Sequence, residues 1–420
     1  MKHKCRPLYL ALCVAMASSS AFAVDFNGYV RAGTGIAGSG GGLQRGDEFH
    51  KNLLGRLGNE FDTYAEIGLG QELFNQDEHS MYLDTMFSME SDGNMEKENT
   101  SQSGSGEAEF GIKKAVLKIK GYIPDAPDAT IWAGKRFYQR QDVHIIDTKF
   151  LNISGYGAGV EGLNAGPGTV SLAVVRGDDD IDDAVSSDDL NIYYLDARYS
   201  NLKPWDGAWA EVAMAYAVVN PTDDQDDVDS LDFDNGFMFT AQLSQSFSRG
   251  YNKTALQYGT KGLAQNMISQ GGGWYDVWSG DVNSAKGYRL INTGDFKVTD
   301  NLLIDHVITY GYAQDHGDYV DDENLLSIVM RPTYSWSNYN KTILELGYFK
   351  DKKSWTSGSE TKTGGEKITL AHAFTVGKEF LSRPELRFYV SYFKDEEGTY
   401  FKNGSKDNDI FYGAQFEAWW

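Results

Sequence analysis

The chain ends with Ile410-Phe411-Tyr412-Gly413-Ala414-Gln415-Phe416-Glu417-Ala418-Trp419-Trp420, and two kinds of side chain alternate in this stretch. The even-numbered positions are all apolar or aromatic, whereas the odd-numbered positions include Gly413, Gln415 and Glu417. Successive side chains of a β-strand point to opposite faces, so a period of two predicts a strand with one apolar face. This segment therefore predicts a strand that meets an apolar phase on one side only.

The same alternation recurs along the whole chain, for example in residues 25–33 and 63–72. About eighteen such segments start near residues 25, 62, 80, 113, 129, 157, 168, 190, 208, 236, 252, 287, 302, 325, 340, 366, 385 and 409. Outside the first 23 residues, no stretch shows the period of about 3.6 residues that is typical of an amphipathic helix. The sequence therefore predicts an all-β protein.

Composition excludes several other classes of protein. Apolar residues make up 41% of the 420 positions, and no run reaches the roughly 20 apolar residues of a membrane-spanning helix. The 38 basic and 60 acidic residues give a net charge of −22, which would repel the phosphates of a nucleic acid. The 25 Tyr, 22 Phe and 9 Trp carry too much apolar surface for a disordered chain.

The predicted strands are joined alternately by short turns, such as residues 75–77, and long loops, such as residues 90–111 and 260–286. This layout is typical of a transmembrane antiparallel β-barrel in a Gram-negative outer membrane, whose closed sheet pairs its backbone groups without an edge. An even strand number places both termini on the short-turn side, the periplasm. The aromatic last residue also resembles the assembly signal of outer-membrane proteins. A soluble, secreted all-β protein is the alternative, but each apolar strand face would then need a core, and no propeller-like repeat is present.

The first 23 residues predict a cleaved secretory signal peptide. A basic start precedes an apolar run over residues 8–17, and Ala21-Phe22-Ala23 has the small residues of a cleavage site. The run is too short to span a membrane, which argues against an uncleaved anchor. The expected organisation is a signal peptide over residues 1–23 and one porin β-barrel domain over residues 24–420.

A barrel of about eighteen strands encloses a water-filled lumen, whereas eight strands fill their own interior with side chains. We expect one long extracellular loop to fold inward and narrow this lumen. Residues 139–155 suit that role because they mix charged side chains with Ile145, Ile146 and Phe150. The alternative is a loop exposed to solvent. The prediction is an open pore with one constriction loop.

Strand parity assigns several aromatic and charged side chains to the lumen. Tyr29 and Arg31 share the inner face of the first strand, and Tyr64 and Glu66 share that of the second. Trp419 faces inward on the last strand, which closes against the first, so we expect Trp419 and Tyr29 to be neighbours. Aromatic rings stack on the C–H face of a sugar, and flanking charged groups hydrogen-bond to its hydroxyls. The alternatives are ordinary packing of the wall and an aromatic girdle at the membrane interface.

Two blocks of sequence are particularly specific. They are Arg56-Leu57-Gly58-Asn59-Glu60 with Thr63-Tyr64-Ala65-Glu66, and Ile131-Trp132-Ala133-Gly134-Lys135-Arg136-Phe137-Tyr138-Gln139-Arg140 with Asp142-Val143-His144. Together with Ser382-Arg383-Pro384, they resemble the maltoporin family, the trimeric eighteen-stranded sugar porins. The resemblance implies a homotrimer that moves maltose and maltodextrins along an aromatic slide beside a polar track, with no enzymatic activity and no cofactor.

The resemblance also implies which residues form the binding surfaces. It implies an aromatic slide of Tyr29, Tyr64 and Trp419. It implies a polar track and constriction of Arg31, Arg56, Glu66, Lys113, Arg140, Asp142, His144, Asp147 and Lys149. In this match, Lys113 stands where the family has an arginine, and Lys149 stands where it has the constriction tyrosine.

The chain departs from the family at other aromatic positions. Phe380-Leu381 replaces a slide tryptophan, and no tryptophan occurs around residues 90–110, where the family lends one to the neighbouring subunit. Trp274 or Trp278 could supply the mid-slide aromatic ring. A sucrose-type porin and a general diffusion porin therefore stay open as alternatives. From another class, the alternative is a barrel enzyme such as an outer-membrane lipase.

Metal binding has little support in the sequence. Asp-rich stretches at residues 178–189 and 223–234 would suit a hard cation such as Ca²⁺, but their spacing matches no calcium-binding loop. The seven His show no metal-ligand spacing. Solvated surface charge is the simpler interpretation of the acidic stretches, and we expect no metal site.

Overall fold

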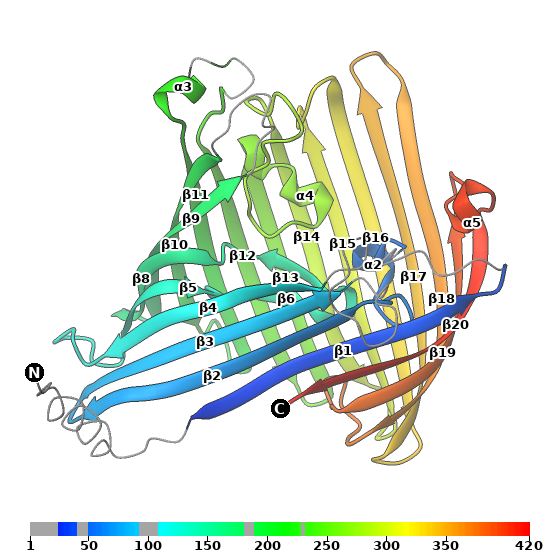
Figure 1. The fold of residues 1–420 in the computed structure, drawn as a ribbon, viewed down its shortest axis with the longest axis horizontal. Coiled ribbons are helices and arrows are strands. Elements are labelled where there is room, and N and C mark those ends of the chain that lie inside the picture. Colours follow the sequence, from blue (N-terminus) through cyan, green and yellow to red (C-terminus); the bar gives the residue numbers. More distant parts are fainter. Residues whose placement is uncertain (1–23, 40–48, 92–107, 180–188, 227, 229–231) are drawn as a thin grey trace, which may run out of the picture.

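A computed structural model describes residues 24–39, 49–91, 108–179, 189–226, 228 and 232–420, so the expected signal peptide lies outside the described residues. In the described part of the chain, eighteen strands form one antiparallel sheet that curves into a barrel (Figure 1). The first strand, β1 (Asp25–Ala37), closes the sheet by pairing with both β2 (Thr63–Gln76) and the last strand, β20 (Asn408–Trp419). The predicted β-barrel and its eighteen strands are confirmed.

Each barrel strand pairs with the barrel strands before and after it in the sequence. The remaining strands of the barrel are β3 (His79–Ser91), β4 (Glu109–Lys120), β5 (Thr130–Arg136), β8 (Gly155–Ala165), β9 (Gly168–Asp179), β10 (Leu190–Leu202), β11 (Ala208–Asn220), β12 (Gly236–Phe247), β13 (Gly250–Thr260), β14 (Lys286–Lys297), β15 (Leu302–Gln314), β16 (Val320–Ser335), β17 (Asn340–Trp355), β18 (Glu360–Thr375) and β19 (Glu385–Asp395). The helices are single turns, namely α2 (Lys51–Leu54), α3 (Asp223–Asp226), α4 (Asn266–Ser269), α5 (Phe401–Gly404), η1 (His144–Ile146) and η3 (Lys261–Leu263). Among the described residues, no helix has the length and apolar character needed to cross a membrane.

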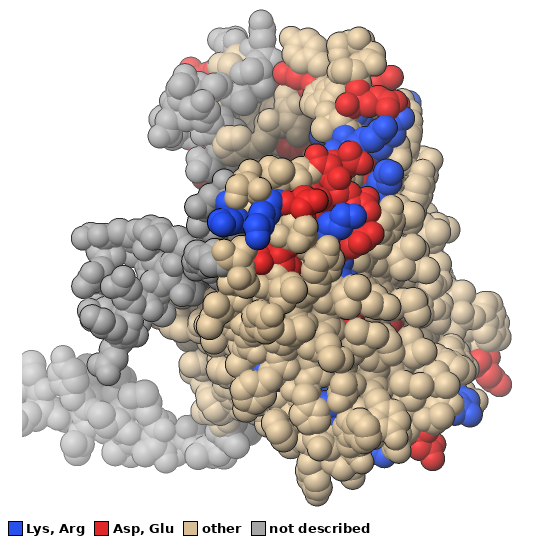
Figure 2. Space-filling model, turned by 90° about the vertical axis from the view of Figure 1, so that its right-hand side faces the viewer, with Lys and Arg blue, Asp and Glu red and all other residues tan. Residues whose placement is uncertain are grey.

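The outer face of the barrel is apolar across its middle. Figure 2 shows charged side chains gathered toward one end of the wall and a broad, largely uncharged surface beneath them. On β18 and β19, the outward-facing Ile368, Leu370 and Phe388 are 49%, 52% and 53% exposed. Trp420 also lies outside, with its ring 5.7 Å from that of Phe26. An apolar band of this kind on a closed sheet is the surface that a lipid bilayer covers.

Three segments of the described chain fold into the lumen. They are residues 49–62, the hairpin formed by β6 (Gln141–Val143), η1 and β7 (Thr148–Leu151), and residues 261–276. The inward fold predicted for residues 139–155 is confirmed, and two further segments fold inward beside it. The other two segments are held both by buried apolar side chains, such as Leu57 and Leu263, and by hydrogen bonds to polar side chains of the wall.

Candidate solute-binding channel

Apolar packing holds the β6–η1–β7 hairpin against the wall. Ile145, Ile146 and Phe150 are at most 3% exposed and belong to one buried cluster with inward-facing side chains of β11 to β16. The Phe150 carbonyl accepts hydrogen bonds from Gln257 Nε2 at 2.7 Å and Arg289 Nη2 at 3.2 Å. The hairpin is thus fixed on one side, and its polar side chains line the lumen on the other.

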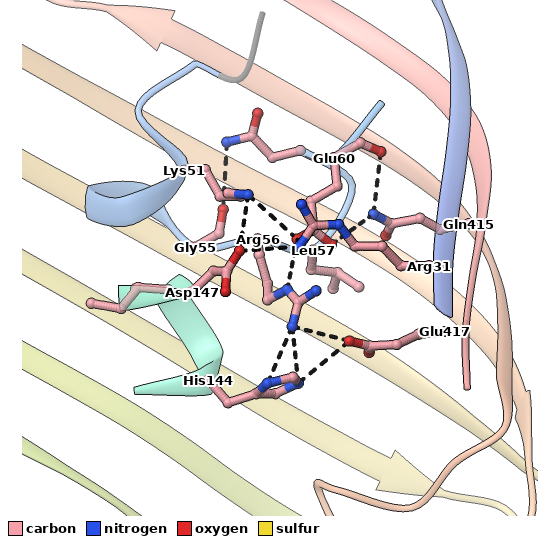
Figure 3. Close-up of polar contacts among 12 residues, drawn as sticks. Arg31, Lys51, Gly55, Arg56, Leu57, Glu60, His144, Asp147, Gln415 and Glu417 are labelled. Atoms are coloured by element: carbon pink, nitrogen blue, oxygen red, sulfur yellow. Dashed lines mark hydrogen bonds and ion pairs between the residues drawn. The ribbon is translucent and has the colours of Figure 1, made fainter. Parts of the chain in front are cut away.

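Buried ion pairs hold residues 49–62 on the facing part of the wall (Figure 3). Arg56 is 1% exposed, its Nε donates to Glu60 Oε1 at 2.8 Å, and its Nη1 lies 3.0 Å from Glu417 Oε1 of β20. The Arg56 amide also donates to the Ile145 carbonyl at 3.2 Å. The two inward segments therefore touch, and together they narrow the lumen.

A cavity of about 580 Å³ lies between the hairpin, residues 49–62 and the wall. It is lined by every site residue predicted from the sequence, namely Tyr29, Tyr64, Trp419, Arg31, Arg56, Glu66, Lys113, Arg140, Asp142, His144, Asp147 and Lys149. The structure thus brings the predicted aromatic slide and the predicted polar track together in one place.

Three aromatic rings follow one another along the wall of this cavity. Tyr29 of β1 lies directly opposite Trp419 of β20, and their rings are 6.3 Å apart and inclined by only 19°. The rings of Tyr29 and Tyr64 are 6.0 Å apart. The expected contact between Tyr29 and Trp419 is confirmed, and the row offers successive ring faces to a solute, with the Tyr64 ring tilted by 55° from that of Tyr29.

A network of charges lies beside the aromatic row. Arg31 Nη2 is 2.6 Å from Asp62 Oδ2, and Arg31 Nη1 is 3.1 Å from Asp147 Oδ2. Lys51 Nζ is also 3.1 Å from Asp147 Oδ2. Burial alone would raise the pKa of Asp147, but the surrounding cations, Arg56 foremost, hold that pKa below its usual range. Asp147 is therefore a firmly ionised hydrogen-bond acceptor in the constriction.

His144 connects the charged network to the aromatic row. Its Nε2 lies 3.1 Å from Arg56 Nη1 (Figure 3). Its ring also meets the ring of Trp419 edge-on, at 5.8 Å. Burial and, after it, the neighbouring Arg56 guanidinium lower the pKa of His144 well below its usual value. His144 is therefore neutral at physiological pH.

Lys149 projects from the hairpin into the cavity, where the sequence placed it. Its side chain is 34% exposed, and its Nζ lies 3.4 Å from Asp147 Oδ1. Lys149 also stands opposite Asp142 across the two strands of the hairpin. A cation paired with a carboxylate thus occupies the lining of the cavity at the hairpin.

The polar track continues along β2 and β4. Tyr64 donates a hydrogen bond to Glu66 Oε1 at 2.5 Å, and Lys113 Nζ lies 5.9 Å from the centre of the Tyr64 ring. Arg140 stacks on Phe137, with its guanidinium carbon 4.2 Å from the ring centre. Charged groups therefore flank the aromatic surface along its length, as the parity of the strands predicted for Glu66.

Four further residues line the cavity and were not predicted as site residues, namely Lys51, Glu90, Phe137 and Asn152. Phe137 could have been found because it belongs to a sequence block that was already singled out. The two tryptophans proposed for the mid-slide position are not part of the cavity lining. Trp274 packs edge-on against Tyr194 at 5.3 Å, and Trp278 is 64% exposed.

In the described part of the chain, no group of three or more His, Cys, Asp or Glu residues is arranged to hold a metal ion. The two Asp-rich stretches fall partly on residues 180–188, 227 and 229–231, which lie outside the described residues.

A closed barrel with an apolar outer wall, whose lumen is narrowed by inward-folded segments of its own chain, defines the class of outer-membrane porins. Residues 24–420 match the LamB porin family. The chain is 48% identical to maltoporin 1 of Aeromonas salmonicida and 49% identical to maltoporin 2 of Yersinia pestis, over 100% of both partners in each comparison. The chain therefore belongs to the LamB porin family, and its place is the outer membrane of a Gram-negative bacterium.

Among solved structures, Salmonella typhi OmpF in complex with daunomycin aligns with 94% of this chain and 98% of its own chain. The TM-score of that alignment is 0.46, and the sequence identity is 11%.

Proposed function

We propose that this porin lets maltose and malto-oligosaccharides diffuse through its lumen, without enzymatic activity. The observation that carries the proposal is the row of Tyr29, Tyr64 and Trp419 on one wall of the cavity. The maltoporin names of its full-length relatives support the same class of substrate. A general diffusion porin would need no such row of aromatic rings.

The proposed passage combines stacking with hydrogen bonding. Each glucose unit places its C–H face on one ring of the row. Its hydroxyls replace their hydrogen bonds to water with hydrogen bonds to Arg31, Asp147 and Lys149. Arg31 and Asp147 already hold each other at 3.1 Å, so the track is ordered before the sugar arrives. Preorganised groups lose little conformational entropy on binding. Successive units can then move from ring to ring with a small change in free energy at each step.

A titration of ion current with sugars tests this proposal. Purified protein in planar bilayers should be blocked more tightly by each longer oligosaccharide from maltose to maltohexaose, because every added glucose contacts more ring surface. Trp419→Ala should weaken the block by about 1 kcal/mol, which is roughly fivefold in the dissociation constant. Trp336→Ala is the matched control, since Trp336 lies on an exposed turn and does not line the cavity.

The same titration separates the alternatives. A current that no maltodextrin changes, in wild type and in Trp419→Ala alike, would leave a general diffusion porin. Tight block by sucrose with weak block by maltose would indicate a sucrose-type porin.

We further propose that the chain loses residues 1–23 on export and assembles as a homotrimer. Mass spectrometry of the N-terminus of membrane-extracted protein tests the cleavage. Native mass spectrometry or gel electrophoresis without heating tests the assembly. A channel-forming preparation that contains only particles of monomer mass would contradict the trimer.

A further inference from the structure

A second cavity, of about 410 Å³, continues from the first beyond the hairpin. The two cavities share only Asp142 and His144 among the described residues that line them. The other walls of the second cavity come from β13, β14 and β15 and from residues 379–381. A sugar chain that extends past the aromatic row along the lumen would enter this space.

The two cavities carry opposite charge among the described residues that line them. Lysine and arginine outnumber carboxylates by six to four in the first cavity. Among the described residues that line the second cavity, the four carboxylates are Asp142, Asp295, Asp305 and Glu379, and Lys253 is the single lysine or arginine. A solute therefore passes from a mildly basic space into an acidic one.

Two of these carboxylates face each other across neighbouring strands. Asp295 of β14 and Asp305 of β15 stand directly opposite each other and face the lumen, and directly opposed Cβ atoms are only about 4.5–5.5 Å apart. Asp305 is 5% exposed, and its Oδ2 is buried without a hydrogen-bond partner in the described structure. Like charges in this arrangement destabilise a sheet, and a buried carboxylate without a partner is costly. A positively charged group is the natural complement.

The nearby cations are committed to other groups. On β16, the other neighbour of β15, Arg331 stands directly opposite Asp305, but its Nε donates a hydrogen bond to Glu345 Oε2 at 2.5 Å. Lys253 Nζ donates to Gln141 Oε1 at 2.9 Å. The pair of carboxylates therefore keeps its acceptor capacity for a group that comes from outside the chain.

A coordinated metal ion does not fit this pair. Ca²⁺ takes roughly six to eight oxygen ligands, and no group of three suitable ligands occurs in the described part of the chain. An ammonium group needs only two or three acceptors and forms charge-assisted hydrogen bonds with carboxylates. The same cavity is lined by Tyr251 and Phe380, whose rings offer an apolar surface for a pyranose that carries the ammonium group.

We propose that Asp295 and Asp305 bind the ammonium group of an amino sugar, so that the channel takes oligosaccharides bearing one amino group in addition to neutral ones. The inference rests on the proposed function, because the remaining glucose units of such a ligand would lie on the aromatic row.

The test compares two ligands that differ in one group. Maltotetraose whose reducing end has been converted to a primary amine is titrated against ion current, beside the neutral reduced alcohol maltotetraitol. The titration uses low salt and a pH of about 8, at which an alkyl amine is still protonated and the carboxyl groups are ionised. Wild type should bind the amine roughly tenfold more tightly than the alcohol, because two charge-assisted hydrogen bonds are added. The double variant Asp295→Asn/Asp305→Asn should bind both ligands equally, with unchanged affinity for the alcohol.

Asp300→Asn is the matched control, because Asp300 lies exposed in the turn between β14 and β15 and outside the cavity lining. It should keep the wild-type preference for the amine. Equal binding of the two ligands by wild type, or a preference that survives in the double variant, would overturn the inference and leave the proposed function intact. If neither ligand blocks the channel, the proposed function itself fails. The open-channel current of each variant shows that the barrel has folded.

Discussion

The hairpin and residues 49–62 narrow the same lumen, yet buried charge pairs contribute far more to holding residues 49–62 than to holding the hairpin. Ile145, Ile146 and Phe150 of the hairpin are buried among apolar side chains of the wall. In residues 49–62, the most buried side chains include Arg56 and Glu60, at 1% and 2% exposure. The hairpin is fixed largely by exclusion of water from apolar surface. Residues 49–62 combine such packing, through Leu54 and Leu57 at 0% exposure, with buried charge pairs and hydrogen bonds to the wall.

The backbone of residues 49–62 is also bound by the wall. Lys367 Nζ donates to the Gly55 carbonyl at 2.6 Å, and the Leu57 amide donates to Glu345 Oε1 at 3.0 Å. Such bonds require a particular position of the segment and act together with its buried apolar side chains. The comparison therefore predicts that residues 49–62 set the exact shape of the channel, and that the hairpin sets how far it is closed.

The largest effect is expected from Arg56→Met, which removes the cation between Glu60 and Glu417. Leaving buried carboxylates without this partner should lower the free energy of unfolding by about 4 kcal/mol. The midpoint of urea unfolding, followed by tryptophan fluorescence in detergent, measures the change. Arg56→Lys keeps the charge and should lose much less. A loss as large in Arg56→Lys as in Arg56→Met would show that shape at this position matters more than charge.

The loss of unfolding free energy caused by Arg56→Met should become smaller as the pH falls. Burial raises the pKa of Glu60, but Arg56 and Arg31 bring it below its usual value. A carboxyl group with a lowered pKa in the folded state stabilises the fold above its unfolded pKa, and this contribution is lost as the pH falls. The difference between wild type and Arg56→Met should therefore shrink in acid, because a protonated Glu60 no longer needs the cation.

A somewhat smaller effect is expected from Ile146→Ala in the hairpin. Removing a fully buried isoleucine leaves a cavity and should cost about 3 kcal/mol. In contrast to Arg56→Met, this loss should not change between neutral and acidic pH, because no titratable group is uncovered. The single-channel conductance should rise as the hairpin loosens from the wall. A pH-dependent loss in Ile146→Ala would remove the distinction between the two segments.

The same comparison explains what the sequence could predict. All eighteen strands were found because the alternation of side chains is a local pattern that each strand carries by itself. The hairpin was found because its apolar residues interrupt a charged loop. The inward fold of residues 49–62 was not found, because the partners of Arg56 and Glu60 lie on the distant strands β1 and β20, and no local pattern links them to this segment.

The site residues were predictable for related reasons. Parity along β1, β2 and β20 assigned Tyr29, Tyr64 and Trp419 to the lumen, and the family resemblance added the charged residues. Phe137 was missed because its contact with Arg140 depends on how the chain bends after β5, which no periodic pattern encodes. The carboxylate pair of the second cavity was missed because Asp295 and Asp305 become neighbours only through the register of β14 and β15.

A smaller effect is expected from Lys149→Tyr, which changes the channel and leaves its scaffold intact. A tyrosine would add a flat ring to the constriction, and it should tighten the block by malto-oligosaccharides by about 1 kcal/mol. Loss of the lysine charge at this narrow point should also raise the preference for cations, most clearly at low salt. Sugar titrations and reversal potentials in a salt gradient measure the two effects. If neither changes, Lys149 does not line the constriction.

The smallest effect is expected at His144, which belongs to the hairpin and contacts Arg56 of residues 49–62. Burial and Arg56, together with Arg383 and Arg331, keep its pKa low in spite of the opposing Glu417. His144 should therefore stay neutral in the folded channel while the pH falls from about 8 to about 6, near the ordinary histidine value. Sugar block in wild type and His144→Gln should accordingly respond to pH in the same way over this range.

The free energy of unfolding should depend on pH through His144, although sugar block should not. The unfolded chain protonates this histidine near pH 6.5, whereas the fold does not, so acid favours unfolding at this position. His144→Gln should therefore lose less stability than wild type as the pH drops from about 7 to about 5, in the urea assay used for Arg56. An equal loss in both proteins would mean that His144 gains its proton without cost in the fold, and that the cations of residues 49–62 do not control the charge of the hairpin.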